Sequence, residues 1–254
     1  MCKSFSLVCA SQLPRVILCF STLVFLLMTS CSDSLEEPTV DDYEQARRKM
    51  LENDLAGRDI SDPVVMEAMR KTPRHEFVPP GMRTAAYDDH PLPISAEQTI
   101  SQPYIVALMT QLLQPDKNQR ILEIGTGSGY QAAVLSEMVK HVYTVEIIPE
   151  LAKTAGVTLK RLNYQNITVK NGDGYQGWPE EAPFDGILVT AAPDHVPAPL
   201  IEQLAVGGRL IIPVGTEGHV QQLKVLEKTL EDVVESNIIP VRFVPMTGQA
   251  QEAR

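Results

Sequence analysis

The stretch Ile121-Leu122-Glu123-Ile124-Gly125-Thr126-Gly127-Ser128-Gly129 decides the fold of this chain. Its apolar first half predicts a buried parallel strand, because such strands are short, apolar and bounded by turn residues. The three glycines, spaced two apart, predict a tight loop whose backbone approaches a ligand closely. Tyr130 stands where a dinucleotide fingerprint carries its third glycine, so a pyrophosphate fits poorly and we expect a cofactor without phosphates. A plain strand-to-helix turn is the alternative for this motif taken alone.

The sequence after the glycine loop alternates between strand-like and helix-like segments. Strand-like runs cover residues 141–146, 166–170, 184–190, 209–214, 221–228 and 238–244. Helical patterns cover residues 130–140, 149–163 and 199–204, and Gly207-Gly208 predicts a turn. This βαβα order predicts an α/β domain with a doubly wound, mostly parallel seven-stranded sheet and helices on both faces.

The residues before the glycine loop predict an N-terminal helical cap, residues 43–102. Two helices are expected there, 41–56 and 62–72, the second entered through Asp62-Pro63. The end of the cap, 87–102, is predicted to be irregular.

Pro103 then stands where the first residue of another helix belongs, which makes Ser101 or Gln102 the expected N-cap residue. On spacing alone, Ser101 is an ordinary helix cap.

Charge and cysteine content exclude several classes of function. The formal charge is −10, and removing Lys3 and Arg15, the only charged residues before Asp33, leaves 20 basic against 32 acidic residues, a net −12. A body this acidic repels phosphate backbones, so nucleic acid is not an expected partner. All four cysteines lie in the first 31 residues, which excludes a cysteine nucleophile from the rest. The five histidines are far apart, so we expect no metal site.

The first 31 residues are typical of a signal peptide. Basic residues precede an apolar run, 16–28, that is shorter than the roughly 20 residues of a bilayer crossing. Small residues then lead to Cys31, a layout that resembles a bacterial lipoprotein processing site, although Met28 stands where leucine is typical.

We therefore expect an exported protein, lipid-anchored in the periplasm through Cys31, with residues 32–42 as a linker and 43–254 as the functional domain. The alternatives are a cleaved secretory signal, an uncleaved anchor, and a cytoplasmic protein whose translation starts near Met50.

Suitable groups for a ligand stand at the carboxyl ends of three predicted strands, where ligands bind in open parallel sheets. The first is the glycine loop, and the second is Glu146, placed to accept hydrogen bonds from ribose hydroxyls. The third is Gly172-Asp173-Gly174, where a carboxylate could meet a base amino group. Together they predict an adenosine-containing ligand, although Glu146 alone could be a solvated strand end and Asp173 a turn residue.

These motifs resemble the cofactor motifs of S-adenosylmethionine-dependent methyltransferases, which implies a Rossmann-like fold. Within that superfamily, four runs are similar to the protein-L-isoaspartate O-methyltransferases: Pro93-Ile94, Gln98-Thr99-Ile100-Ser101-Gln102-Pro103-Tyr104, Thr190-Ala191-Ala192-Pro193 and Arg242-Phe243-Val244-Pro245. The similarity covers about residues 43–247. Ser95-Ala96-Glu97 departs from the glycines that bacterial relatives usually carry, which leaves the shape of the substrate loop open.

The resemblance implies a cofactor site and an active-site residue. It places S-adenosylmethionine on Thr99, Ile100, Gly125, Thr126, Gly127, Ser128, Glu146, Asp173 and Gly174. It makes Ser101 the active-site serine.

The resemblance also implies methyl transfer from S-adenosylmethionine to the free α-carboxyl of L-isoaspartyl residues in damaged proteins. We expect the protein to be a monomer. An α-carboxyl has an unperturbed pKa of about 3.3 to 3.7, so it is ionised at neutral pH and needs no general base. We therefore expect Ser101 to position the acceptor and not to act as a nucleophile. A methyltransferase for another carboxylate or small molecule and a catalytically silent lipoprotein that serves as a binding module are the alternatives.

Overall fold

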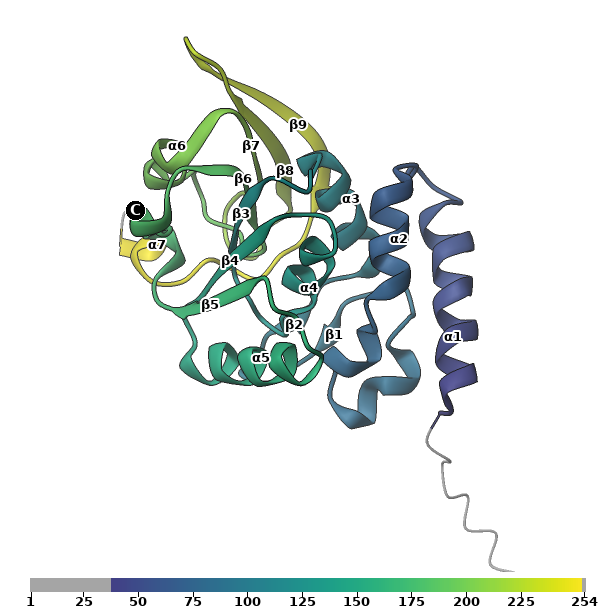
Figure 1. Ribbon diagram of the computed structural model, residues 1–254. Coiled ribbons are helices and arrows are strands. Elements are labelled where there is room, and N and C mark those ends of the chain that lie inside the picture. The colour runs from purple at the N-terminus through teal and green to yellow at the C-terminus, as the bar shows by residue number, and fades with distance from the viewer. Residues whose placement is uncertain (1–37, 253–254) are drawn as a thin grey trace, which may run out of the picture. The chain divides into compact units, whose positions relative to one another are not determined.

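The computed structural model describes residues 38–252, which contain a seven-stranded sheet with helices on both faces (Figure 1). The strand order is β5-β4-β3-β6-β7-β8-β9, with parallel pairing from β5 to β7 and antiparallel pairing of β8 and β9. The strands are β3 (Arg120–Ile124), β4 (His141–Glu146), β5 (Ile167–Asn171), β6 (Phe184–Val189), β7 (Leu204–Val214), β8 (Gln221–Lys228) and β9 (Val233–Val241). The predicted doubly wound sheet is confirmed.

Successive side chains of β3 point to opposite faces of the sheet, and the apolar core accordingly forms two layers. Ile121 belongs to the layer under the N-terminal helices, whereas Leu122 and Ile124 belong to the layer on the opposite face. The helices of the domain are α3 (Pro103–Leu113), α4 (Tyr130–Ser136), α5 (Pro149–Arg161), α6 (Ala198–Gln203) and α7 (Gln249–Glu252). Because β3 is buried on both faces after Arg120, its remaining residues are apolar except for Glu123.

The N-terminal cap begins with α1 (Val40–Lys49), which continues without a break as a π-helix, Met50–Leu55. The helix starts inside the predicted linker because Thr39 and Asp42 form a capping box. The second helix, α2 (Pro63–Lys71), starts on Asp62 as predicted, with the Asp62 side chain accepting main-chain N–H groups.

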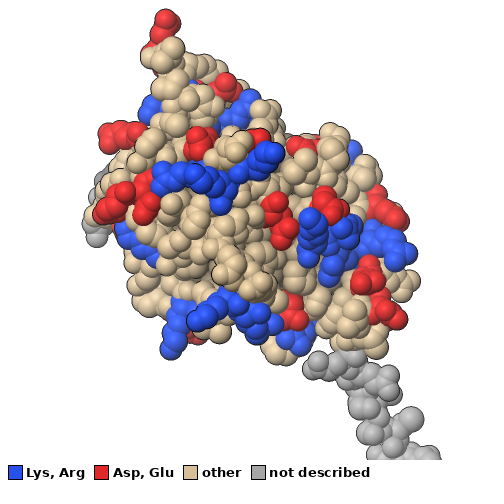
Figure 2. Space-filling view, viewed as in Figure 1, with Lys and Arg blue, Asp and Glu red and all other residues tan. Residues whose placement is uncertain are grey.

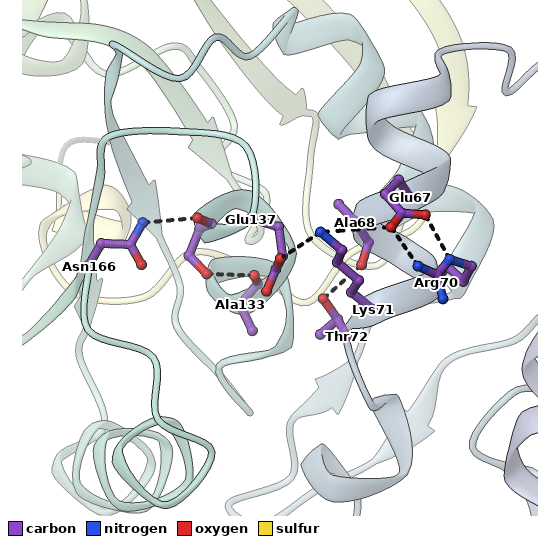
Figure 3. Close-up of polar contacts among 9 residues, drawn as sticks. Glu67, Ala68, Arg70, Lys71, Thr72, Ala133, Glu137 and Asn166 are labelled. Carbon is purple, nitrogen blue, oxygen red and sulfur yellow. Dashed lines mark hydrogen bonds and ion pairs between the residues drawn. The ribbon is translucent and has the colours of Figure 1, made fainter.

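Polar contacts join the cap to the domain (Figure 3). Lys71 at the end of α2 lies 3.9 Å from a carboxylate oxygen of Glu137, which follows α4. Asn166, just before β5, donates to the main-chain oxygen of Ser136 at 2.9 Å. These contacts link three segments that are far apart in the sequence.

Three predictions about local secondary structure are wrong. Residues 87–102 contain a small hairpin, β1 (Leu92–Pro93) with β2 (Thr99–Ile100). Gly207-Gly208 lies inside β7 and not in a turn, because the pairing of β6 with β7 shifts register there. The last strand, β9, begins at Val233, five residues before the predicted start, because it pairs along the whole of β8.

The surface seen in Figure 2 mixes Lys and Arg with Asp and Glu and has no wide expanse of a single sign. Among residues 38–252, no helix is long and apolar enough to cross a membrane. The proposed signal segment and Cys31 lie outside the described residues.

Candidate active site

The glycine loop turns from β3 into α4 with the left-handed backbone that its sequence predicts. Gly125, Gly127 and Gly129 have φ values of +95°, +52° and +88°. A Cβ atom on Gly125 would lie 2.3 Å from the hydroxyl of Thr190, which itself donates to the main-chain oxygens of Ile124 and Gly125. Only glycine fits this close approach of the loop to the end of β6.

Glu146 ends β4 beside the loop and is held by two main-chain amides. One carboxylate oxygen accepts the Gly127 N–H at 2.8 Å, and the other accepts the Ile148 N–H at 3.0 Å. The side chain is buried, so both bonds are shielded from water. The carboxylate keeps further acceptor positions, which suits it to a ligand with paired hydroxyl groups.

Glu123 lies beneath the loop and is fully buried. Its Oε2 accepts the Thr144 hydroxyl at 2.5 Å, and Thr144 contacts the Thr126 hydroxyl at 2.6 Å. Its Oε1 has no hydrogen-bond partner within residues 38–252. Burial, together with the nearby charge of Glu146, raises the pKa of Glu123 to about 8 against the hydrogen bond from Thr144. The carboxyl is therefore mainly protonated at neutral pH.

One cavity joins the predicted cofactor residues. Its lining includes Thr99, Ile100, Ser101, Gly125, Thr126, Gly127, Ser128, Glu146 and Gly174. Within the described chain, Glu146 is the one charged side chain in this lining. The described lining therefore has one carboxylate and no cation that would bind a phosphate. This charge fits a positively charged adenosyl cofactor and not a dinucleotide.

Asp173 is the exception among the predicted cofactor residues, because it does not line this cavity. Its carboxylate faces the chain itself and accepts the N–H groups of Tyr175 and Gln249 at 2.9 and 2.8 Å. The C-terminal segment thus packs on Asp173, and Met246 and Thr247 form that part of the wall. A role for Asp173 toward a base amino group stays a prediction.

Ser101 lies between β2 and α3, and its hydroxyl makes no hydrogen bond with any described residue. The N-cap position is taken by Gln102, whose side chain does not cap the helix. Ser101 is half-buried and lines the cofactor cavity. The hydroxyl is thus available to a ligand.

A second cavity adjoins the first, and Ser101 lines both. Thr99, Thr190 and Val244 are the other shared residues. Its wall is otherwise made by α3 and by the chain around the end of β9, including Ile105, Pro240 and Phe243. Arg242 is the one charged side chain among the described residues that line it, and this side chain is exposed. The second cavity therefore favours an anionic ligand.

Sequence reasoning missed the C-terminal wall of the site. Residues 244–247 line the cofactor cavity because the chain after β9 runs beside the loop that follows β6. Ala192 donates to Val244 O at 2.8 Å, and Met246 donates back to Ala192 O at 2.9 Å. In the sequence, this segment was indicated only by the run Arg242-Phe243-Val244-Pro245, which is similar to the family but was given no role.

Known proteins match most of the chain. The model of a family described as protein-L-isoaspartate(D-aspartate) O-methyltransferase (PCMT) matches residues 45–251. A protein-L-isoaspartate O-methyltransferase of Gloeobacter violaceus is 56% identical over 200 residues, covering 79% of this chain and 98% of the relative. Protein-L-isoaspartate O-methyltransferase 2 of Syntrophobacter fumaroxidans is 51% identical over 236 residues, covering 89% and 96%.

Two solved structures share the fold. A protein-L-isoaspartate O-methyltransferase matches with a TM-score of 0.72 and 32% identity, covering 80% of this chain and 67% of that one. A Plasmodium falciparum protein described as a β-aspartate methyltransferase (PCMT), solved in complex with S-adenosyl-L-homocysteine, matches with a TM-score of 0.68 and 27% identity. That match covers 79% of this chain and 98% of the other.

Proposed function

Since the chain belongs to the protein-L-isoaspartate(D-aspartate) O-methyltransferase family, we propose that its methyl transfer takes place where Ser101 joins the two cavities. The enzyme is a repair methyltransferase that moves a methyl group from S-adenosylmethionine to the free α-carboxyl of isoaspartyl residues. The observation that carries the proposal is the position of Ser101, which lines both cavities. Of the described residues, the first cavity has one carboxylate and the second has one guanidinium.

The residues of the first cavity fit the cofactor. Glu146 takes the ribose hydroxyls, since its carboxylate is fixed by Gly127 and Ile148 and faces the cavity. Because Gly125 has no side chain, the loop packs closely against Thr190 and leaves room for the ligand. S-adenosylmethionine, when bound, supplies an electrophilic methyl group, so the acceptor oxygen needs alignment and not a base.

The residues of the second cavity act on the acceptor. Arg242 attracts the carboxylate, and apolar side chains such as Ile105 and Phe243 exclude water from it. Ser101 donates its free hydroxyl to one carboxylate oxygen, which leaves the other oxygen directed at the first cavity. A hydroxyl that donates to an anion fixes its orientation without removing its nucleophilicity, so Ser101 is a positioning group in this scheme and not the nucleophile.

Replacing Ser101 by alanine tests this assignment. A hydrogen bond to a charged group contributes about 1.5 to 3 kcal/mol, so kcat on an isoaspartyl peptide is expected to fall roughly 10- to 150-fold. Calorimetry is expected to give an S-adenosylmethionine affinity close to that of the parent. Ser95→Ala, in the exposed turn of the β1–β2 hairpin that precedes Ser101 and outside both cavities, is the matched control. Unchanged turnover of the Ser101 variant would remove the serine from the reaction.

We propose further that the protein is exported and lipidated at Cys31, and that it acts as a monomer. The basic, apolar and small residues before Cys31 support export. Cell fractionation with sequencing of the mature amino terminus tests the first part: a terminus blocked at Cys31 is expected, and a free one near Met50 would place the protein in the cytoplasm. Light scattering of the purified protein tests the second part.

A further inference from the structure

The first turn of α3, next to Ser101, is capped by a residue from outside the helix. Pro103 has no N–H group, so the Tyr104 N–H is the first that lacks a partner within the helix. Asp89 supplies one, because its Oδ1 accepts the Tyr104 N–H at 2.9 Å. The Ser101 hydroxyl is thereby released from the capping role that its sequence position predicts.

The other carboxylate oxygen of Asp89 connects the first turn of α3 to Arg58 of the N-terminal cap. Oδ2 accepts Gln102 Nε2 at 2.7 Å and Arg58 Nη1 at 3.2 Å. The Arg58 guanidinium also lies over the Tyr104 ring, 3.3 Å from its centroid. The Asp89 side chain is only 17% exposed, so water competes weakly for these contacts. One carboxylate therefore fixes the chain on either side of Pro103.

We propose that Asp89 is a positioning residue for methyl transfer, holding the Gln102–Tyr104 turn so that the Ser101 hydroxyl stays free at the junction of the two cavities. The proposal rests on the proposed function of Ser101. Without Asp89, the orphan Tyr104 N–H takes the nearest side-chain acceptor, and a serine hydroxyl three residues earlier is the usual one. Ser101 would then cap the helix and turn away from the acceptor.

The test compares Asp89→Ala with Asp62→Ala. Asp62 caps α2 through the N–H groups of Val64 and Val65 and lies outside both cavities, so it is a matched helix cap away from the reaction. Because a displacement of about 1 Å can cost about a hundredfold in rate, we expect Asp89→Ala to lower kcat on an isoaspartyl peptide at least tenfold. The S-adenosylmethionine affinity of the variant is expected to stay within about twofold of that of the parent, which is well below the tenfold change that a loss of 1.4 kcal/mol in binding free energy would give. Asp62→Ala is expected to lower Tm with kcat unchanged.

Two further measurements separate positioning from general destabilisation. Asp89→Asn keeps an acceptor for Tyr104 and is expected to recover most of kcat. In a Ser101→Ala background, Asp89→Ala is expected to add little further loss, since residues that act as a unit are not additive.

The outcomes are distinguishable. Normal turnover of Asp89→Ala beside an impaired Ser101→Ala would overturn the role of Asp89 and leave that of Ser101. Full additivity of the two substitutions, or parallel losses of kcat and cofactor affinity in Asp89→Ala, would also overturn it. Normal turnover of Ser101→Ala would overturn both.

Discussion

Glu123 makes the stability of this enzyme depend on pH in a direction that is unusual for a carboxyl group. Most carboxylates in proteins gain a partner on folding, which lowers their pKa and stabilises the fold at neutral pH. Glu123 instead loses water and gains only the Thr144 hydroxyl, and its pKa rises from 4.5 to about 8. The folded protein therefore binds this proton more tightly than the unfolded chain does.

The size of the effect follows from that shift. Between pH 4.5 and pH 8 the folded state holds a proton that the unfolded state has released, so the free energy of unfolding falls by about 1.4 kcal/mol per pH unit from this group. The stabilisation is complete below pH 4.5 and is lost as the pH rises through 8. The total change is at most about 5 kcal/mol.

Glu123→Gln isolates this contribution, because an amide keeps the shape of the side chain and its acceptor for Thr144 but has no proton to lose. Urea unfolding of both proteins between pH 5 and pH 9 gives their difference in stability. We expect the parent to lose stability relative to the variant by about 1.4 kcal/mol per unit up to pH 8 and the difference to become constant above it. Other titrating groups, such as His75 and His141, cancel in the difference. Parallel curves would show that Glu123 ionises at its ordinary pKa.

Two further substitutions test the two cavities separately. Gly125→Ala is expected to weaken S-adenosylmethionine binding at least tenfold in calorimetry, since the new methyl group meets Thr190 at 2.3 Å and the positive φ costs about 1 to 3 kcal/mol; Gly81→Ala, in open space, is its control. Arg242→Gln is expected to raise KM for an isoaspartyl peptide by up to about fivefold, as for an exposed ion pair, and to reduce the salt dependence of KM. A raised Kd for S-adenosylmethionine in the Arg242 variant would contradict the division of roles.

The sequence predicted the parts of the fold in which local pattern and global structure agree. The run from Ile121 to Gly129 forms the expected strand and loop, and α2 begins on Asp62. The prediction of a turn at Gly207-Gly208 was wrong because a glycine pair occurs at strand irregularities as well as in turns. Only the pairing with β6 distinguishes the two cases. The hairpin at residues 92–100 was not predicted, because strands of two residues are too short to show a hydrophobic periodicity.

The position of a site residue could be predicted where that residue stands at the carboxyl end of a predicted strand. Glu146 ends β4, so its position follows from the βα order. The contact of Asp173 with Gln249 could not be predicted in the same way, because Gln249 lies 76 residues further on. Capping of α3 by Asp89 was hidden for a similar reason: the sequence offered Ser101 and Gln102 as nearer candidates, and nothing local shows that a carboxylate 15 residues before Tyr104 reaches its N–H.

In the scheme proposed above, the charges of the two cavities bear on turnover as well as on binding. Methyl transfer from a cofactor with a sulfonium to a carboxylate removes a positive charge on one side of Ser101 and a negative charge on the other. Among the described residues, each cavity is lined by one charged side chain whose sign is opposite to that of the substrate proposed for it, Glu146 in the first and Arg242 in the second. Each therefore attracts its substrate more strongly than its neutralised product, since an ester and a thioether offer no charge to either.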